Sequence, residues 1–137
     1  MSRLIVLDNE AIRVLANPAH PKHRRVISHL QVVASRKRSA AAIDVAVPTA
    51  VRVEAGWDRT MPSWAFLNRL RILDLPLDVT HANVAASLRA MSGISVADAH
   101  LGAAIHLTAA EDITVITSDP DDARRLAKDK KVTIVTI

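Results

Sequence analysis

Short runs rich in Val and Ile alternate along the chain with longer stretches of helical periodicity, and this alternation is what most constrains the fold. The short runs predict strands at 3–7, 45–48, 71–75, 113–117 and 132–137. The stretches between them predict helices at 9–16, 21–36, 50–58, 63–70, 80–91, 96–110 and 120–129. Because helices between strands act as crossovers, we expect an α/β fold with a parallel sheet covered on both faces.

The chain has the length of one domain, and we expect residues 1–137 to form it, since no linker or repeat interrupts the pattern. Half of the residues are hydrophobic but only 2% are aromatic. The core must therefore be built from Val, Ile, Leu and Ala.

Several classes of protein are excluded by what the sequence lacks. Without cysteine the chain forms no disulfide, thiolate zinc site or Cys nucleophile. Its three glycines form neither a GxGxxG motif nor a P-loop. No apolar run has the length of a membrane span or a signal peptide, so we expect a cytoplasmic protein without membrane association. The net charge of +4 and pI of about 10.1 favour an acidic partner such as nucleic acid.

Four carboxylates occupy positions where a functional site is expected. Asp8 follows the first predicted strand and Asp119 follows the fourth. In open α/β sheets, sites lie at the carboxyl ends of strands, where the strand order reverses. Asp98 and Glu54 come from helices, each within an apolar stripe that should face inward, so all four acids are expected to converge.

Helix capping is the alternative explanation for most of these acids. Asp8 and Asp119 each precede a predicted helix, and Pro120 follows Asp119 as a first helical residue. Asp98 fits a capping box with Ser95, and Asp122 can serve Asp119 in the same way. Capping does not account for Glu54, so the four acids together favour a hard cation such as Mg²⁺, with Mn²⁺ as a substitute.

The segments "IVLDNEAI", "VPTAVRVEAGW", "SVADAHLGAAI" and "VITSDPDDARRL", in this order, resemble the four acidic motifs of PIN-domain ribonucleases, above all the VapC-like toxins of toxin–antitoxin pairs. The resemblance covers essentially the whole chain. It implies a PIN-like three-layer α/β/α sandwich with a five-stranded parallel sheet of order 3-2-1-4-5. One departure is Glu10, which stands where such proteins often carry Ser or Thr, and which puts a polar contact and the number of metal ions in question.

Carried over to this chain, the resemblance assigns Asp8, Glu54, Asp98 and Asp119 as the catalytic acids, with Asp122 as a possible fifth. Asp8, Asp98 and Asp119 would hold Mg²⁺, and Glu54 would be a ligand or orient water. The implied function is Mg²⁺-dependent hydrolysis of RNA phosphodiester bonds by a toxin. The implied partners are an RNA substrate, a cognate VapB-like antitoxin and a second copy in a homodimer.

Contact with RNA is expected to fall to basic residues, because phosphate contacts give affinity without sequence information. Some of these residues lie in the "PKHRR" segment and others lie near the acidic motifs; they are Arg13, Lys22, Arg24, Arg25 and Arg52. A solvated helix face is the alternative for each of them. The six histidines lack zinc-binding spacing, and we expect them to be surface or core residues.

Two other classes compete with the nuclease. A response-regulator receiver would also place acids at strand ends, but it needs a phospho-acceptor Asp after the third strand. Asp78 is the only candidate downstream of that strand. A catalytically silent PIN-like module that binds RNA or protein is the second. The presence of all four acids argues against a silent module.

Overall fold

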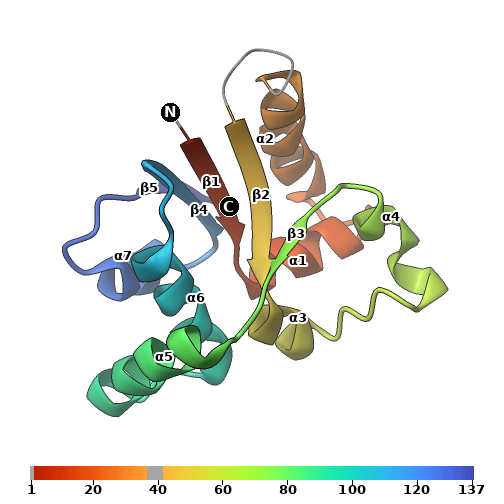
Figure 1. Ribbon diagram of the computed structural model, residues 1–137. Helices are drawn as coiled ribbons and strands as arrows, with labels where there is room; N and C mark the ends of the chain where they lie inside the picture. The colour runs from red at the N-terminus through yellow and green to blue at the C-terminus, as the bar shows by residue number, and fades with distance from the viewer. Residues whose placement is uncertain (1, 37–41) are drawn as a thin grey trace.

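A single parallel sheet forms the middle layer of the molecule (Figure 1). The computed structural model describes residues 2–36 and 42–137. The strands are β1 (Ser2–Leu7), β2 (Ala42–Pro48), β3 (Leu73–Leu75), β4 (Asp112–Thr117) and β5 (Thr133–Thr136). They pair in the order β3-β2-β1-β4-β5, with every pairing parallel. This order confirms the expected sheet. It also rules out the receiver alternative, because doubly wound receivers have the order 2-1-3-4-5.

Helices cover both faces of the sheet (Figure 1). The helices are α1 (Asn9–Ala16), α2 (His23–Arg36), α3 (Thr49–Ala55), α4 (Ala65–Asn68), α5 (Val79–Ser92), α6 (Val96–Leu107) and α7 (Pro120–Ala127), with a 3₁₀ turn η1 at Pro62–Trp64. Among the described residues, no helix is long and apolar enough to cross a membrane.

The two faces arise from the alternation of side chains along each strand. In β1, Leu4 and Val6 pack with Leu101 of α6 and Leu126 of α7. Leu7 points to the other face, into a core shared with α1, α2, α3 and α4. The three-layer α/β/α sandwich predicted from the sequence is therefore confirmed.

The predicted helix at 50–58 is too long, and its true end is set by Gly56. Helix α3 stops at Ala55, and Gly56 follows with φ 75°, a left-handed conformation that favours glycine. The predicted helix at 96–110 likewise ends early, at Leu107, because Thr108 is extended.

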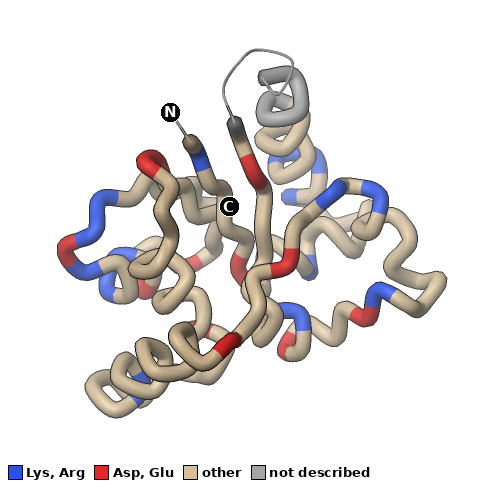
Figure 2. Tube along the Cα trace, viewed as in Figure 1, with Lys and Arg blue, Asp and Glu red and all other residues tan. Residues whose placement is uncertain are grey.

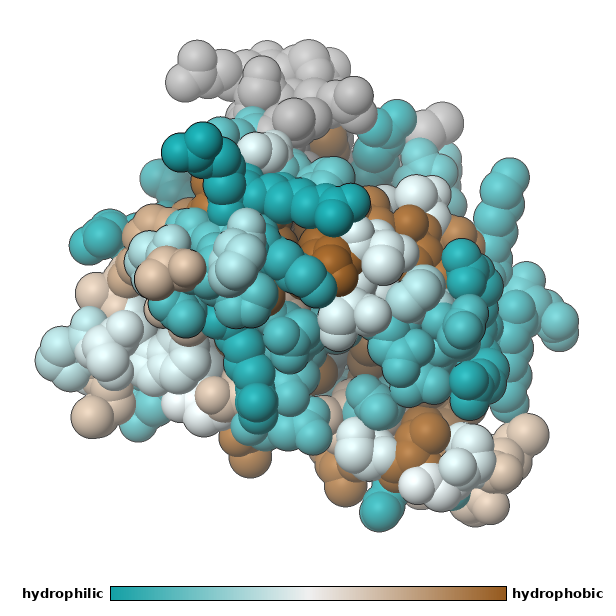
Figure 3. Space-filling model, turned by 180° about the vertical axis from the view of Figure 1, so that it is seen from behind, coloured by the Kyte–Doolittle hydropathy of each residue, from teal (hydrophilic) through white to brown (hydrophobic). Residues whose placement is uncertain are grey.

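The surface carries exposed hydrophobic side chains in several places. From behind, hydrophobic residues appear as separate patches on a largely hydrophilic surface (Figure 3). Among the exposed large hydrophobic residues, Val53 is 82% and Val79 is 79% accessible. Both lie on helices that flank the carboxyl edge of the sheet.

Candidate acidic site at the carboxyl ends of β1 and β4

Asp8 joins the first strand to the first helix. Its Oδ1 accepts a hydrogen bond from the backbone N–H of Ala11 at 2.8 Å, which caps α1. Burial raises the pKa of this carboxyl above its usual range, opposed mainly by the hydroxyl of Thr117, which donates to it. The charges of Glu10 and Asp98 raise the pKa further, so Asp8 lies within electrostatic range of both.

Asp98 lies in the first turn of α6, where its backbone N–H donates to the Oγ of the N-cap residue Ser95 at 3.1 Å. The side chain is half-buried, while Leu101 and Ile105 on the same helix are in the core. The predicted inward orientation of this helix face is confirmed. Since Asp98 contributes to the pKa of both Asp8 and Asp122, it is the link between the two strand ends.

Asp119 and Asp122 form a pair at the start of α7. Asp119 is the N-cap, and its Oδ1 accepts from the N–H of Asp122 at 3.1 Å. This bond lowers the pKa of Asp119. The pKa of Asp122 is raised, first by its side-chain hydrogen bond to Asp119, then by burial and by the charges of Asp119 and Asp98.

Asp98 thus lies within electrostatic range of both Asp8 and Asp122, and Asp122 contacts Asp119 directly. Burial chiefly raises the pKa of Asp8, the hydrogen bond to Asp119 chiefly raises that of Asp122, and nearby negative charge raises both further. The donor chemistry therefore fits a hard divalent ion. Within residues 2–36 and 42–137, however, no three His, Asp or Glu side chains are gathered closely enough to hold a metal ion.

The interpretation of Glu54 as an inward-facing acid is wrong. Because α3 ends at Ala55, Glu54 lies in its last turn and is exposed, next to the exposed Val53. It lines an open depression of about 410 Å³ together with Ser95, Val96 and other residues of α3 and α6. Glu54 is thus near the start of α6, and its catalytic role stays a prediction.

Thr117 is a site residue that the sequence did not reveal. It is 3% exposed, donates to Asp8, and its Oγ1 accepts from the backbone N–H of Asp119 at 2.9 Å. One hydroxyl therefore fixes the two acids at the ends of β1 and β4. The available signal was its position in "VITSD", two residues before an acid at a strand end.

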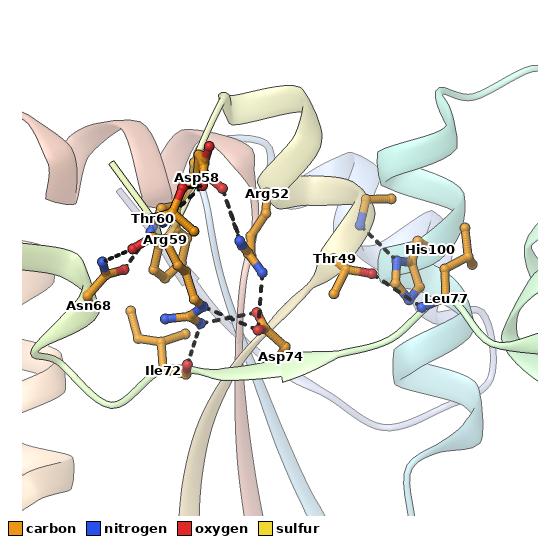
Figure 4. A network of polar contacts seen from close by, with 12 residues as sticks. Thr49, Arg52, Asp58, Arg59, Thr60, Asn68, Ile72, Asp74, Leu77 and His100 are labelled. Atoms are coloured by element: carbon orange, nitrogen blue, oxygen red, sulfur yellow. Dashed lines mark hydrogen bonds and ion pairs between the residues drawn. The ribbon is translucent and has the colours of Figure 1, made fainter. Parts of the chain in front are cut away.

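Arg52, one of the predicted RNA-binding residues, lies in a partly exposed polar network (Figure 4). Its guanidinium bonds Asp74 at 3.1 Å and donates twice to the carbonyl oxygen of Trp57. Arg59 binds the same carboxylate, donates to the carbonyl of Ile72, and lies 4.3 Å from the Trp57 ring centroid. This network fastens the segment after α3 to β3, and it occupies the donors that Arg52 would offer to RNA.

The other predicted basic residues differ in their exposure and in the hydrogen bonds that they make within the protein. Lys22 donates to the carbonyl oxygen of Ile137 at 2.8 Å, and the exposed Arg13 donates to Asn9. Arg24 and Arg25 are exposed on α2. The RNA-binding role of these residues stays a prediction.

Two histidines on α6, the helix that carries Asp98, make hydrogen-bonding contacts to the backbone of neighbouring helices. His100 is fully buried, and its Nδ1 accepts from the N–H of Ala50 at 3.2 Å (Figure 4). His106 contacts the carbonyl oxygen of Leu126 at 2.8 Å. Their placement agrees with the expected core or surface role.

Beside the acids, α5, α6 and α7 enclose a cavity of about 200 Å³. Its lining combines two acids, two cations and apolar side chains; it includes Asp98, Asp122, Arg125, Lys128, Met91 and Leu126. A space of this composition can take a group that is partly anionic and partly apolar.

No family model matches the sequence, and no curated protein matches it. Several solved structures match it, among them the following two. One is the crystal structure of VapBC2 from Rickettsia felis bound to a DNA fragment from its promoter. The matching chain is 12% identical to this one and superposes with a TM-score of 0.61 over 98% of each chain. The chain has a VapC-like PIN fold. PAE2754 from Pyrobaculum aerophilum superposes with a TM-score of 0.52 at 16% identity, over 96% of this chain and 92% of the other.

Proposed function

We propose that this protein is a metal-dependent ribonuclease that acts as the toxin of a VapC-like toxin–antitoxin pair. The observation that carries the proposal is the placement of Asp8 and Asp119 at the carboxyl ends of the paired strands β1 and β4, with Asp98 and Asp122 together in the adjoining cavity. This is the strand-order switch point, where α/β folds place their sites. The likeness to VapBC2 supports the toxin assignment.

The proposed reaction is hydrolysis of an RNA phosphodiester, in which water adds to phosphorus and the opposite oxygen leaves. Asp8, Asp98 and Asp119 would hold Mg²⁺ or Mn²⁺, with Asp122 beside them. The ion, when bound, supplies positive charge against the developing phosphate charge and lowers the pKa of water. Thr117 keeps Asp8 and Asp119 in place. Glu54, which lies near the start of α6, would orient water or complete the set of metal ligands.

The decisive experiment is cleavage of RNA by purified, partner-free protein across a Mg²⁺ and Mn²⁺ titration, with EDTA as the control. We expect cleavage that requires metal and is lost in Asp98→Asn. Asp121→Asn is the matched variant, since it removes an exposed carboxylate of α7 that pairs with Arg124. It should cut as the wild type does. Folded wild-type protein that cuts no RNA with either metal would overturn the nuclease and favour a silent binding module.

The proposed partners are a cognate VapB-like antitoxin and a second copy of the chain. The support for the antitoxin is the VapBC2 match. The support for a homodimer is the exposed apolar rim of Val53, Val96 and Leu77 around the depression beside Glu54. Light scattering after gel filtration should give twice the monomer mass, and Val53→Asp should return the monomer.

A further inference from the structure

The segment from Arg124 to Lys131, "RRLAKDKK", concentrates the positive charge of the chain. It holds five cations and one acid, so its formal charge equals the +4 of the whole protein. Figure 2 shows these basic residues along the end of α7 and the loop that leads to β5. Arg124 and Arg125 pair with Asp121 and Asp122 at 3.1 and 3.4 Å. Within the described part of the chain, the three lysines of the segment form no ion pair.

The loop that carries these lysines is held in a fixed shape. Lys128 adopts φ 49°, which is unusual for a residue other than glycine, and its N–H bonds the carbonyl of Arg124 at 3.1 Å. The N–H of Lys130 bonds the carbonyl of Ala127 at 2.9 Å. A backbone strain of this kind persists only where the surroundings enforce it. The lysines are therefore presented on an ordered turn, which lowers the entropy lost on binding.

The turn adjoins the acidic site. Lys128 and Arg125 line the cavity of about 200 Å³ that also contains Asp98 and Asp122. The Nζ of Lys128 lies 3.5 Å from the Sδ of Met91, so this side chain reaches from α7 to α5. Lys128 also lines a second depression, of about 510 Å³, together with Lys130 and Lys131. The two depressions thus meet at Lys128 and form a basic path that begins beside the acids.

We propose that Arg125, Lys128, Lys130 and Lys131, here called the α7 path, bind backbone phosphates of single-stranded RNA as it leaves the acidic site. This inference rests on the proposed function. A polyanion approaching several carboxylates needs cations nearby to offset the repulsion. Arg125 and Lys128 of the α7 path lie in the same cavity as two of the acids, and Lys130 and Lys131 continue into the second depression. Arg52, by contrast, is bound to Asp74 and Lys22 to Ile137.

The test is binding of a short fluorescein-labelled single-stranded RNA, followed by anisotropy in EDTA so that no cleavage occurs. The variant is Lys128→Gln with Lys130→Gln and Lys131→Gln, and Arg69→Gln, an exposed residue at the end of α4, is the charge control. Each lost phosphate contact on a single strand lowers the salt slope by about 0.7, so the triple variant should lower it by about 2. At 0.1 M salt the affinity should fall by up to about 100-fold. Arg69→Gln should match the wild type.

An unchanged affinity and salt slope in the folded triple variant would overturn the inference. The inference would also be overturned if the triple variant lost binding to duplex DNA, or to the antitoxin, but still bound RNA as the wild type does. Arg24→Gln with Arg25→Gln tests whether α2 carries the contacts instead. Cleavage assays in Mg²⁺ keep the two proposals separate. If the wild type cuts RNA and the triple variant binds it equally well, only the α7 path fails. If the triple variant loses binding but the wild type never cuts, only the nuclease fails.

Discussion

The backbone N–H of Asp8 donates to the carbonyl oxygen of Ile116 at 3.3 Å. This bond continues the β1–β4 pairing, in which Leu7 is already in register with Ile116, by one residue beyond the end of β1. The first acid is therefore positioned by the sheet itself. The next residue along β4 is Thr117, whose hydroxyl completes the connection to Asp119.

Thr117→Val should loosen the acidic site and destabilise the fold. The change keeps the shape but removes the hydroxyl that donates to Asp8 and accepts from Asp119. Leaving buried polar groups without a partner costs about 1–3 kcal/mol. Urea unfolding measures this loss. Thr133→Val, at an exposed position of β5, is the control and should change the free energy of unfolding little. Equal effects of the two variants would contradict the role of Thr117.

Asp8→Asn and Asp78→Asn should shift the melting temperature in opposite directions. Both residues are N-caps, and Asn preserves a cap. The pKa of Asp8 is raised in the folded protein, so at pH 7 its charge opposes folding and removing it should be stabilising. The pKa of Asp78 is lowered by hydrogen bonds from His81, so removing its charge should be destabilising. Calorimetry in EDTA at pH 7 decides the signs, and a shift in the same direction for both would refute the argument.

Mg²⁺ should stabilise the wild-type protein but not Asp8→Asn. A ligand that binds only the folded state stabilises it by about 2.7 kcal/mol at 100 times its Kd. Melting temperatures across a Mg²⁺ titration measure this, with Asp121→Asn as the variant that should still respond. A wild-type melting temperature that is indifferent to both Mg²⁺ and Mn²⁺ would contradict metal binding by the acids.

Stability should fall as the pH drops below the ordinary histidine range, because of His100. Burial, followed by the nearby charge of His81, lowers the pKa of His100 below its ordinary 6.5, while Asp78 acts in the opposite sense. Between the lowered pKa and 6.5 the unfolded chain binds a proton that the folded chain does not, so stability rises with pH there and levels off above it. Urea unfolding from about pH 7 to about pH 5 should show a slope of at most about 1.4 kcal/mol per unit. His100→Gln should flatten it, and a slope unchanged by that substitution would exclude His100 as the cause.

Most of the fold could be predicted because the local signals agree with the tertiary structure. Helix α1 begins and ends where the sequence predicts, since Asp8 is both a strand-end residue and an N-cap. The parallel sheet followed from alternating strands and helices. The end of α3 was missed although Gly56 marks it, because the apolar pattern continues to the buried Trp57. Glu54 was expected to face inward because Val51 and Trp57 lie three residues to either side of it; both are buried, but Glu54 is exposed in the last turn of α3.

The candidate site was harder to predict than the fold. A hydroxyl that links two acids, as in Thr117, depends on the register of two strands that are far apart in the sequence. The turn at Lys128 has no sequence signal at all, since positive φ is expected of glycine and not of lysine. Consequently the basic residues predicted from the sequence lie on α1, on and just before α2, and on α3, and those at the end of α7 were missed.

Capping by the acids has a genetic consequence. Asp8 and Asp119 each start a helix, so most replacements at these positions would remove a carboxylate and weaken a helix in one step. Asparagine avoids this, because it caps a helix as well as aspartate does and discards the charge, and a single base change converts an aspartate codon to an asparagine codon. A population selected for loss of activity should therefore accumulate Asp→Asn alleles at these positions, and those alleles should yield normal amounts of folded, inactive protein.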